Sequence, residues 1–491
     1  MSQSFDLRIN PPPAPDRGLG RCCLINPPHF IKEGNIWNQI RSTMPPLGLL
    51  YLAGVLEQAG IAVDVIDFQA EFDSWQALET TLACSRYDFY GITGTTPAIN
   101  NAYRIAAIIK KHHPQAGVIL GGVHVTALPE EALARDGVDW VVRGEGEMAL
   151  LNLVTGAPAA TILGLSYRHG DRIVHNQPDG LVENLDTIPP PAFHKLDLTR
   201  YQPAAGAYKR LPAINMTTTR GCPARCTFCN SANIRLRRRS AEKIFAEMAM
   251  LVHTFHVREI QFYDDTFTVF PSNIKKLCRM IIDQGLDVTW SCFARADYVN
   301  PELLHIMKQA GCHQIMYGIE SADEKILANI QKNCSREKSI QAIAMTRAAG
   351  IDSRCTFMLG NPGETVATIR ATIRLAQELN PDIAVFNITM PFPGTHMFRW
   401  AKEQGYLRCE DWDSYDLGTP ILMLPTISAD EIISMYRLAY RSFYLRPRFI
   451  LSRLRRIQSL DDFKVLLRGA IGLAGFVRKT LSWKHDHEPD R

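Results

Sequence analysis

Short apolar runs alternate with longer amphipathic stretches through the first third of the chain. Several of the apolar runs end in a segment of glycine, proline or other small residues. Short strands separated by helices are typical of a parallel sheet with helices on both faces. The pattern predicts strands at 22–26, 62–67, 89–93, 117–121 and 140–142, and helices at 48–59, 75–84, 98–112 and 129–136. We therefore expect an α/β fold with a doubly wound, Rossmann-like domain over residues 21–169.

A second alternating region follows, in which apolar runs recur at roughly equal intervals and each precedes a helical stretch. The runs lie at 213–217, 259–263, 288–292, 314–317, 353–359 and 384–389. Units of this kind form an open, partial version of the (β/α)8 barrel, whose functional groups gather at the carboxyl ends of the strands. We expect this partial (β/α)6 barrel of the TIM type to span residues 213–400.

The remaining segments connect or follow these two regions. Residues 1–20 are rich in proline and predict a disordered leader. Residues 170–212, with a proline run at 186–192, predict a linker between the domains. Beyond residue 400 the strand rhythm stops, so residues 401–491 are expected to form a helical C-terminal region.

The end of that region is basic and aromatic. Six arginines lie between Arg441 and Arg456, interleaved with aromatic and aliphatic side chains. A basic amphipathic tail of this kind suits an anionic membrane surface, whereas an ordinary solvated helical cap on the barrel fits the same pattern. No nucleic-acid-binding motif accompanies the charge, so nucleic acid is not expected as a partner.

Composition changes this picture little. The 491 residues, 46% hydrophobic and 21% charged, exceed one core and suit two or three domains. The net charge of +4 by itself indicates neither nucleic acid nor an acidic substrate. The twelve cysteines are scattered and no signal segment or apolar run of about 18 residues is present, which favours a cytoplasmic protein. Peripheral contact with the inner membrane surface through the tail stays open.

Chemistry concentrates in one loop, directly after the first strand of the predicted barrel. Cys222, Cys226 and Cys229 have the spacing Cys-x3-Cys-x2-Cys. Three thiolates can hold a [4Fe-4S] cluster and leave its fourth iron open to a small molecule. A zinc loop is the alternative, but structural zinc usually takes two ligand pairs, and no matching Cys/His pair follows.

The loop resembles that of the radical S-adenosylmethionine (SAM) enzymes, including the aromatic Phe228 before the third cysteine. The resemblance implies that the open iron chelates SAM and that the reduced cluster cleaves it to a 5′-deoxyadenosyl radical. Phe228 is a candidate SAM contact, as are Arg295 and Glu320 at later strand ends and Arg354 on the fifth strand of the barrel. Structural ion pairs are the alternative for the three charged side chains, because buried charges are usually paired.

The loops of the N-terminal domain lack the Gly-x-Gly-x-x-Gly turn of dinucleotide sites. Pro-Pro-Leu-Gly at 45–48, Gly-Gly-x-His at 121–124 and Gly-Glu-Gly-Glu at 144–147 instead resemble the cobalamin-binding domain that precedes many radical SAM domains. The expected cobalamin contacts are Gly91, Thr95, Gly121, Gly122, His124, Gly144, Glu145 and Gly146. The Asp-x-His-x-x-Gly run that supplies a cobalt ligand elsewhere is absent, so the lower ligand of cobalt stays open. His124 could ligate cobalt or serve as a hydrogen-bonding loop residue.

Together these resemblances imply a cobalamin-dependent radical SAM enzyme that methylates an unactivated carbon by means of the 5′-deoxyadenosyl radical and methylcobalamin. An oxidative cyclase or anaerobic hydroxylase, as in the tetrapyrrole cyclase branch, is the first alternative. A non-catalytic cobalamin sensor and a methylthio-transferring enzyme are weaker ones. The expected partners are a small-molecule, lipid or tetrapyrrole substrate and an electron donor such as flavodoxin or ferredoxin. No individual catalytic residue and no substrate can be named from the sequence.

Overall fold

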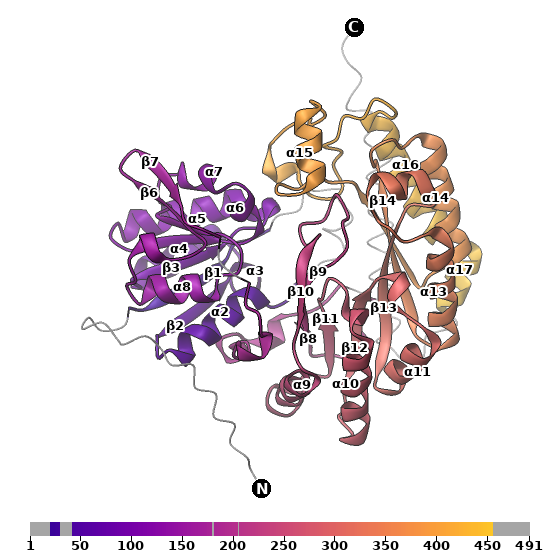
Figure 1. Ribbon diagram of the computed structural model, residues 1–491, viewed down its shortest axis with the longest axis horizontal. Helices are drawn as coiled ribbons and strands as arrows, with labels where there is room; N and C mark the ends of the chain where they lie inside the picture. Colours follow the sequence, from indigo (N-terminus) through magenta and orange to yellow (C-terminus); the bar gives the residue numbers. More distant parts are fainter. Residues whose placement is uncertain (1–19, 30–41, 179–180, 205, 455–491) are drawn as a thin grey trace. The chain divides into compact units, whose positions relative to one another are not determined.

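The computed structural model describes residues 20–29, 42–178, 181–204 and 206–454 (Figure 1). Contacts divide the chain into two compact units. The first comprises residues 1–30, 45–200 and 237–239, and the second comprises 31–44, 201–236 and 240–491. Each unit is described by itself below.

The first unit is built on one mixed sheet in which the first five strands are parallel. Its strands are β1 (Cys22–Asn26), β2 (Val63–Asp67), β3 (Phe89–Thr93), β4 (Gly117–Gly121), β5 (Trp140–Val142), β6 (Leu165–His169) and β7 (Arg172–His175). Its helices are α2 (Leu47–Gln58), α3 (Phe68–Glu71), α4 (Trp75–Cys84), α5 (Ile99–His112), α6 (Val123–Ala127), α7 (Pro129–Leu133) and α8 (Glu147–Val154). The strand order β2-β1-β3-β4-β5-β6-β7 reverses direction between β1 and β3. Ligands of doubly wound sheets bind beyond the carboxyl ends of the strands at such a switch point.

The five parallel strands agree with the expected ones to within one residue. The structure differs from the expectation after residue 169, because the antiparallel strand β7 lies inside the expected linker and completes the sheet. The chain then stays with the first unit as far as Arg200, and Leu185 and Phe193 are buried there. The β6–β7 hairpin lies at the edge of the sheet and is largely exposed, so its polar sequence resembled a loop.

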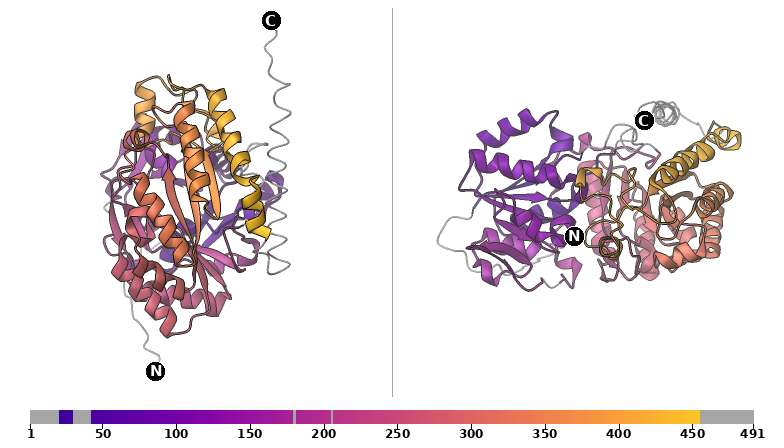
Figure 2. Two further views of the ribbon diagram at one scale, coloured as in Figure 1. Left: turned by 90° about the vertical axis from the view of Figure 1, so that its right-hand side faces the viewer. Right: turned by 90° about the horizontal axis from the view of Figure 1, so that it is seen from above.

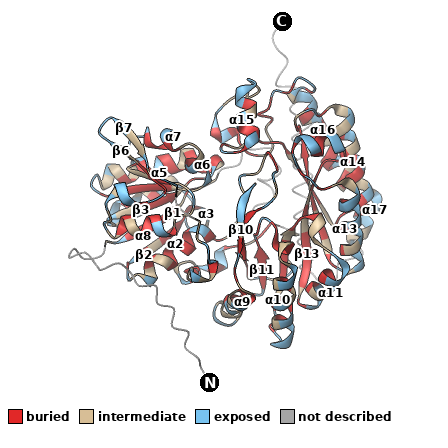
Figure 3. Cartoon of the chain, in the orientation of Figure 1, coloured by how far each residue is buried: buried red, intermediate tan, exposed pale blue. Residues whose placement is uncertain are grey.

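The second unit is an open barrel of parallel strands in the order β15-β14-β13-β12-β11-β8. The barrel strands are β8 (Ala213–Met216), β11 (Glu259–Phe262), β12 (Thr289–Ala294), β13 (Cys312–Glu320), β14 (Asp352–Leu359) and β15 (Ile383–Ile388), with a two-stranded sheet of β9 (Thr219–Cys222) and β10 (Ile234–Arg238). The helices are α9 (Ala241–Phe255), α10 (Pro271–Asp283), α11 (Pro301–Gln309), α12 (Glu324–Asn329), α13 (Arg336–Ala348), α14 (Val366–Leu379), α15 (His396–Glu403), α16 (Ala429–Tyr444) and α17 (Pro447–Leu454). The strands are mostly buried, whereas the helices expose their outer faces (Figure 3). The partial barrel predicted from the sequence is confirmed.

The floor of the barrel, at the amino ends of the strands, is polar and filled. Residues 206–210 reach into it: Gln261 and Gln314 donate to the carbonyls of Ala207 and Gly206 at 2.6 and 3.0 Å. Glu259 accepts from two further backbone amides of this segment and contacts His313 at 2.8 Å. Because these groups satisfy one another, a ligand inside the barrel must approach from the carboxyl ends of the strands.

The C-terminal helices cover the free edge of the barrel. α16 lies beside α14 (Figure 2). The Tyr440 hydroxyl donates to the Phe386 carbonyl at 3.0 Å and accepts from its amide at 3.2 Å. Tyr444 makes the same pair of bonds with Ala384 at 2.7 and 3.2 Å. Two tyrosines one helical turn apart thus occupy the backbone groups that an edge strand leaves open.

The described part of the basic tail packs on this barrel. Arg446 donates to the Gln377 carbonyl at 2.9 Å and to the Asn380 side chain, and Arg453 pairs with Asp382 at 3.2 Å. Phe449 is buried. These contacts favour the helical cap, and peripheral membrane association is not supported; residues 455–491 lie outside the described part of the chain. Among the described helices, none combines the length and apolar character needed to cross a bilayer.

Candidate functional site

The cysteine loop is held by backbone contacts on both sides. β9 ends at Cys222, after Gly221 with φ of +88°, where a Cβ would overlap the carbonyl oxygen of Arg235. Within the loop, the Thr227 amide donates to the Ile330 carbonyl at 3.0 Å, and its carbonyl accepts from the Met397 amide at 2.8 Å. The loop is therefore fixed to segments far away in the sequence.

A buried carboxylate fixes the turn that leads into the loop. Asp264, at the end of β11, accepts from the amides and hydroxyls of Thr218 and Thr219, with the Thr218 amide at 2.8 Å. Burial raises the pKa of Asp264 to about 6, and the threonine hydrogen bonds oppose this shift. This side chain therefore supports the turn between β8 and β9.

The three cysteines are free thiols in the described structure. Cys222 and Cys226 are buried and Cys229 is half-buried. Burial raises the pKa of Cys229 to about 11 and also raises that of Cys226, where Lys332 and Arg295 oppose it. No three His, Cys, Asp or Glu side chains converge on a single ion among the described residues. Three free thiols on one loop suit a cluster, in which each cysteine binds a different iron.

Glu320 forms a structural ion pair, the alternative that the sequence left open for this residue, with a partner that the sequence did not indicate. Its Oε1 lies 3.0 Å from Lys332 Nζ, and both side chains are buried. Glu320 has φ of +67°, and a Cβ on Gly318 would lie 2.8 Å from that ammonium and overlap the carboxylate. Lys332 lies between Gln331 and Asn333, which both have positive φ. No local sequence pattern marked Lys332 as the partner of a site residue.

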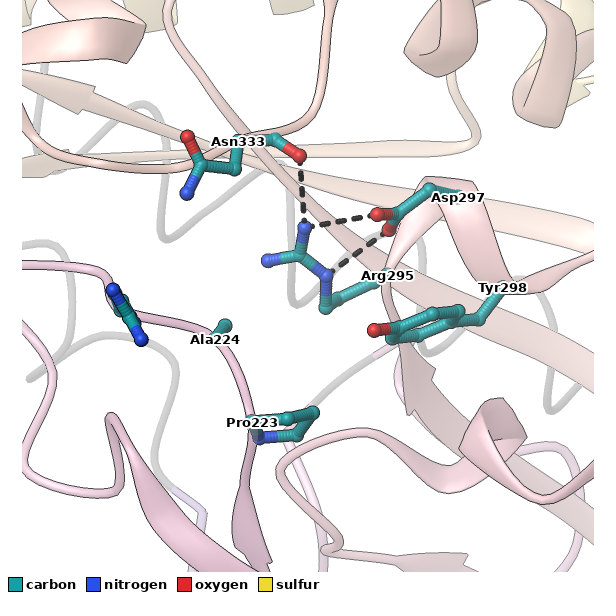
Figure 4. A pocket seen from close by; sticks show the side chains of 7 residues that line it. Pro223, Ala224, Arg295, Asp297, Tyr298 and Asn333 are labelled. Carbon is teal, nitrogen blue, oxygen red and sulfur yellow. Dashed lines mark hydrogen bonds and ion pairs between the residues drawn. The ribbon is translucent and has the colours of Figure 1, made fainter.

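Arg295 lines a cavity of about 320 Å³ beside the cysteine loop, together with Pro223, Ala224, Arg225, Asp297, Tyr298 and Asn333. Its guanidinium makes two bonds of 3.0 Å to Asp297 and donates to the carbonyl of Asn333 (Figure 4). It also donates to the carbonyl of Lys332. Arg295 is therefore near the cluster loop but already has a carboxylate partner.

Arg354 and Phe228 complete the predicted SAM set. Arg354 lies in β14, and its buried Nε has no hydrogen-bond partner within the described residues. Burial lowers the pKa of Arg354, and Tyr444, Tyr263 and Tyr440 oppose the shift. Phe228 is half-buried next to Thr227, whose backbone is bonded on both sides.

In the first unit, the glycine-rich loops after β3 and β4 are joined through their backbones. The Gly94 amide donates to the Gly121 carbonyl at 2.7 Å, and the Gly94 carbonyl accepts from the His124 amide at 3.1 Å. Gly122 has φ of +104°, and a Cβ there would lie 2.8 Å from the Gly94 carbonyl oxygen. Several predicted contact residues at this edge have accessible surface: Thr95, Gly121, Gly122, Gly144 and Gly146. Val123, 50% exposed, adds an apolar side chain that the sequence did not single out.

Three other predicted cobalamin contacts already have partners in the protein. Gly91 lies within β3, where a Cβ would be 2.8 Å from Leu24. Glu145 is bound by Arg237 at 2.7 and 2.9 Å. His124 is fully buried, with Nδ1 3.2 Å from the Thr96 hydroxyl and Nε2 3.8 Å from Glu131. This arrangement favours the hydrogen-bonding role of His124 over ligation of cobalt.

Comparison with known proteins matches both halves of the chain to families. The Radical SAM superfamily model matches residues 216–376, and the B12 binding domain model matches residues 36–154. An uncharacterized methyltransferase from Pyrococcus horikoshii is 34% identical over 436 residues, covering 87% of this chain and 93% of the relative. The chain belongs to the cobalamin-binding radical SAM enzymes.

Other members of this family extend the comparison. The anaerobic magnesium-protoporphyrin IX monomethyl ester cyclase of Rubrivivax gelatinosus is 28% identical, covering 84% of this chain and 76% of the relative. Among solved structures, the radical SAM methyltransferase TsrM from Kitasatospora setae has a TM-score of 0.64 at 21% identity, covering 78% of this chain and 74% of its own. The cobalamin-dependent enzyme OxsB has a TM-score of 0.70 at 16% identity, covering 96% and 74%. These likenesses establish the shared fold.

The cofactors of this radical SAM enzyme are a [4Fe-4S] cluster, SAM and cobalamin. The residues present suit them. Three free thiols lie on one fixed loop at the barrel mouth, and the glycine-rich edge of the first sheet lies at the switch point of its strand order.

Proposed function

We propose that this enzyme transfers a methyl group from SAM to an unactivated carbon of a small-molecule substrate. The observation that carries the proposal is the cysteine loop, whose three thiols would bind three irons and leave the fourth for SAM. The methyltransferase relative, which matches the chain nearly end to end, supports methyl transfer as the outcome.

When bound, the cluster and cobalamin supply the cleavage of SAM and a carrier for the methyl group. Cys222, Cys226 and Cys229 would hold the cluster, and the Asp264–threonine bonds keep their loop in place. Lys332 and Arg295 put positive charge near Cys226, which favours its thiolate form.

The remaining residues orient SAM and keep water out. Phe228 and Glu320 lie on or close to the loop, and Glu320 could accept hydrogen bonds from the ribose or the ammonium of SAM. The filled barrel floor excludes water from below, which protects a radical from side reactions. In the first unit, Thr95, Gly121, Gly122, Gly144 and Gly146 are the proposed cobalamin contacts, since they are accessible at the switch point.

The test uses the full-length protein, purified anaerobically and reconstituted with iron, sulfide and cobalamin. It receives SAM labelled in the methyl group, a reductant and candidate small-molecule substrates. We expect 5′-deoxyadenosine and a product carrying the label. Cys226→Ala should abolish both, whereas Cys84→Ala, an exposed cysteine of the first unit, should abolish neither. A product that forms without the label would contradict methyl transfer.

Oxidative cyclisation or hydroxylation is the second candidate, favoured by the 28% identity to the tetrapyrrole cyclase over most of both chains. The same experiment separates the two, because a cyclised or hydroxylated product carries no methyl label. Either reaction needs electrons at the cluster, and we propose a flavodoxin or ferredoxin as their donor.

A further inference from the structure

Arg354 faces the inside of the barrel. Side chains alternate along a strand, so Arg354 lies on the opposite face of β14 from Cys355 and Phe357. Phe357 stacks on Phe386, which contacts Tyr440 of the outer helix α16, so that face is the helix side. Arg354 therefore points towards the lumen.

The charge of Arg354 is not balanced within the described protein. Arg295 has Asp297 and Lys332 has Glu320, each at 3.0 Å. No described carboxylate forms an ion pair with Arg354, and only tyrosines act on its charge. A guanidinium cannot lose its proton, and burying an unpaired charge is costly. An anionic ligand would offset that cost.

The cluster lies elsewhere. Lys332 and Arg295 are among the main influences on the pKa of Cys226, whereas Arg354 is not among the main influences on Cys226 or Cys229. The carboxylate of SAM must reach the open iron, so Arg295 and Lys332 are closer to that group than Arg354 is. The anion at Arg354 therefore belongs to a second molecule.

The surroundings of Arg354 indicate what that molecule looks like. Through the strand register, Arg354 is level with Met316 of β13 and Phe293 of β12. Phe293 stacks on Tyr263, with ring centroids 5.2 Å apart. Tyr263 remains 36% exposed at the end of β11, so an aromatic face is open at the barrel mouth.

We propose that Arg354 binds an oxyanion, a carboxylate or a phosphate, carried by the methyl-accepting substrate, whose flat apolar part lies against the Tyr263–Phe293 pair. This inference rests on the proposed function. A planar, two-pronged guanidinium suits either oxyanion, and aromatic faces suit a ring. Glu320, Arg295 and the cysteine loop remain for SAM.

The first test measures thermal unfolding of the reconstituted full-length enzyme without substrate. Arg354→Met removes an unpaired, half-buried charge and should raise the unfolding midpoint of the barrel by about 2 °C. Arg295→Met leaves Asp297 without its partner and should lower the midpoint. A midpoint that falls equally in both variants would show that Arg354 has a structural partner and would overturn the proposal.

The second test measures binding, with phenyl phosphate as the probe and phenol as its uncharged control. Phenyl phosphate should raise the midpoint of the wild type more than phenol does, and Arg354→Met should remove that difference while SAM affinity changes less than about threefold. Arg354→Lys, which keeps the charge, should retain part of the difference. If Arg354→Met does not fold, Arg354→Lys is tested in its place. No difference in the wild type, or one that persists in Arg354→Met, overturns the proposal. A loss of SAM affinity of about tenfold or more assigns Arg354 to SAM instead. These outcomes do not depend on methyl transfer, so they leave the labelling experiment independent.

Discussion

The Glu320–Lys332 pair is the best place to test how the barrel mouth is held together. Its atoms lie 3.0 Å apart, and the side chains are 8% and 9% exposed. Lys332→Met removes the ammonium and leaves the Glu320 carboxylate buried without it. Removing one partner of a buried ion pair costs about 3–5 kcal/mol, and we expect a value in this range.

The double variant, Lys332→Met with Glu320→Gln, separates the pair from its surroundings. In the double variant neither position holds a charge without its partner, so we expect it to recover at least about 2 kcal/mol relative to the sum of the single variants. If Glu320 also contacts SAM, the double variant should regain stability but not SAM affinity.

Equilibrium urea unfolding, followed by circular dichroism, measures these effects in the full-length protein. The two units can unfold separately, so each transition needs its own fit. The reasoning is refuted if Lys332→Met costs less than about 1 kcal/mol, or if the effects of the two substitutions simply add.

Three further predictions follow from other parts of the barrel. Burial raises the pKa of Glu364 to about 7, so the protonated form of this group favours the folded state. Its contribution to stability is present below about pH 4.5 and is lost as the pH rises to about 7. In urea unfolding, Glu364→Gln should remove this pH-dependent contribution, which amounts to at most about 3 kcal/mol. An unchanged pH dependence would argue against it. Tyr444→Phe leaves the amide and carbonyl of Ala384 unpaired on the edge strand and should cost about 1–3 kcal/mol. Tyr406→Phe, at a half-buried tyrosine with no hydrogen bond to the edge strand among the described residues, should cost less. Arg225 is exposed between Cys222 and Cys226. Arg225→Glu should slow reduction of the cluster by acidic flavodoxin about tenfold and leave reduction by dithionite unchanged. Equal slowing with both reductants would indicate damage at the cluster.

Hydrophobic periodicity predicted every parallel strand of both units, because buried strands carry the strongest local pattern. The β9–β10 pair was missed. β10 reads Ile234-Arg-Leu-Arg-Arg238, whose three arginines resemble a basic loop. Arg237 of this strand and Arg239 just after it are nevertheless buried, by contacts with residues distant in sequence. One of them, Arg237, binds Glu145, a residue 92 positions earlier that the sequence had assigned to cobalamin.

The tail also shows that local sequence does not determine which contacts a segment makes. Its arginines and aromatic residues matched a membrane-binding pattern when only local composition was considered. In the described part of the tail, Tyr444 instead bonds Ala384 of β15, Arg446 bonds Gln377 of α14, and Arg453 pairs with Asp382 just before β15. A basic amphipathic sequence reports that a helix has one apolar face, and only the tertiary structure reports what that face contacts.

The three charged candidates for SAM contact illustrate what packing adds to a motif. In the sequence, Arg295, Glu320 and Arg354 were equivalent, since each followed the same barrel logic and each could have been a structural ion pair. In the structure, Asp297 and Lys332 neutralise the first two, and neither partner could be chosen from sequence because each depends on how loops fold back over the strand ends. A paired residue can still orient SAM through its remaining hydrogen-bonding atoms, but it adds no net charge to the site. Arg354 does add a net positive charge to the site, so this is the residue whose charge an anionic ligand would balance.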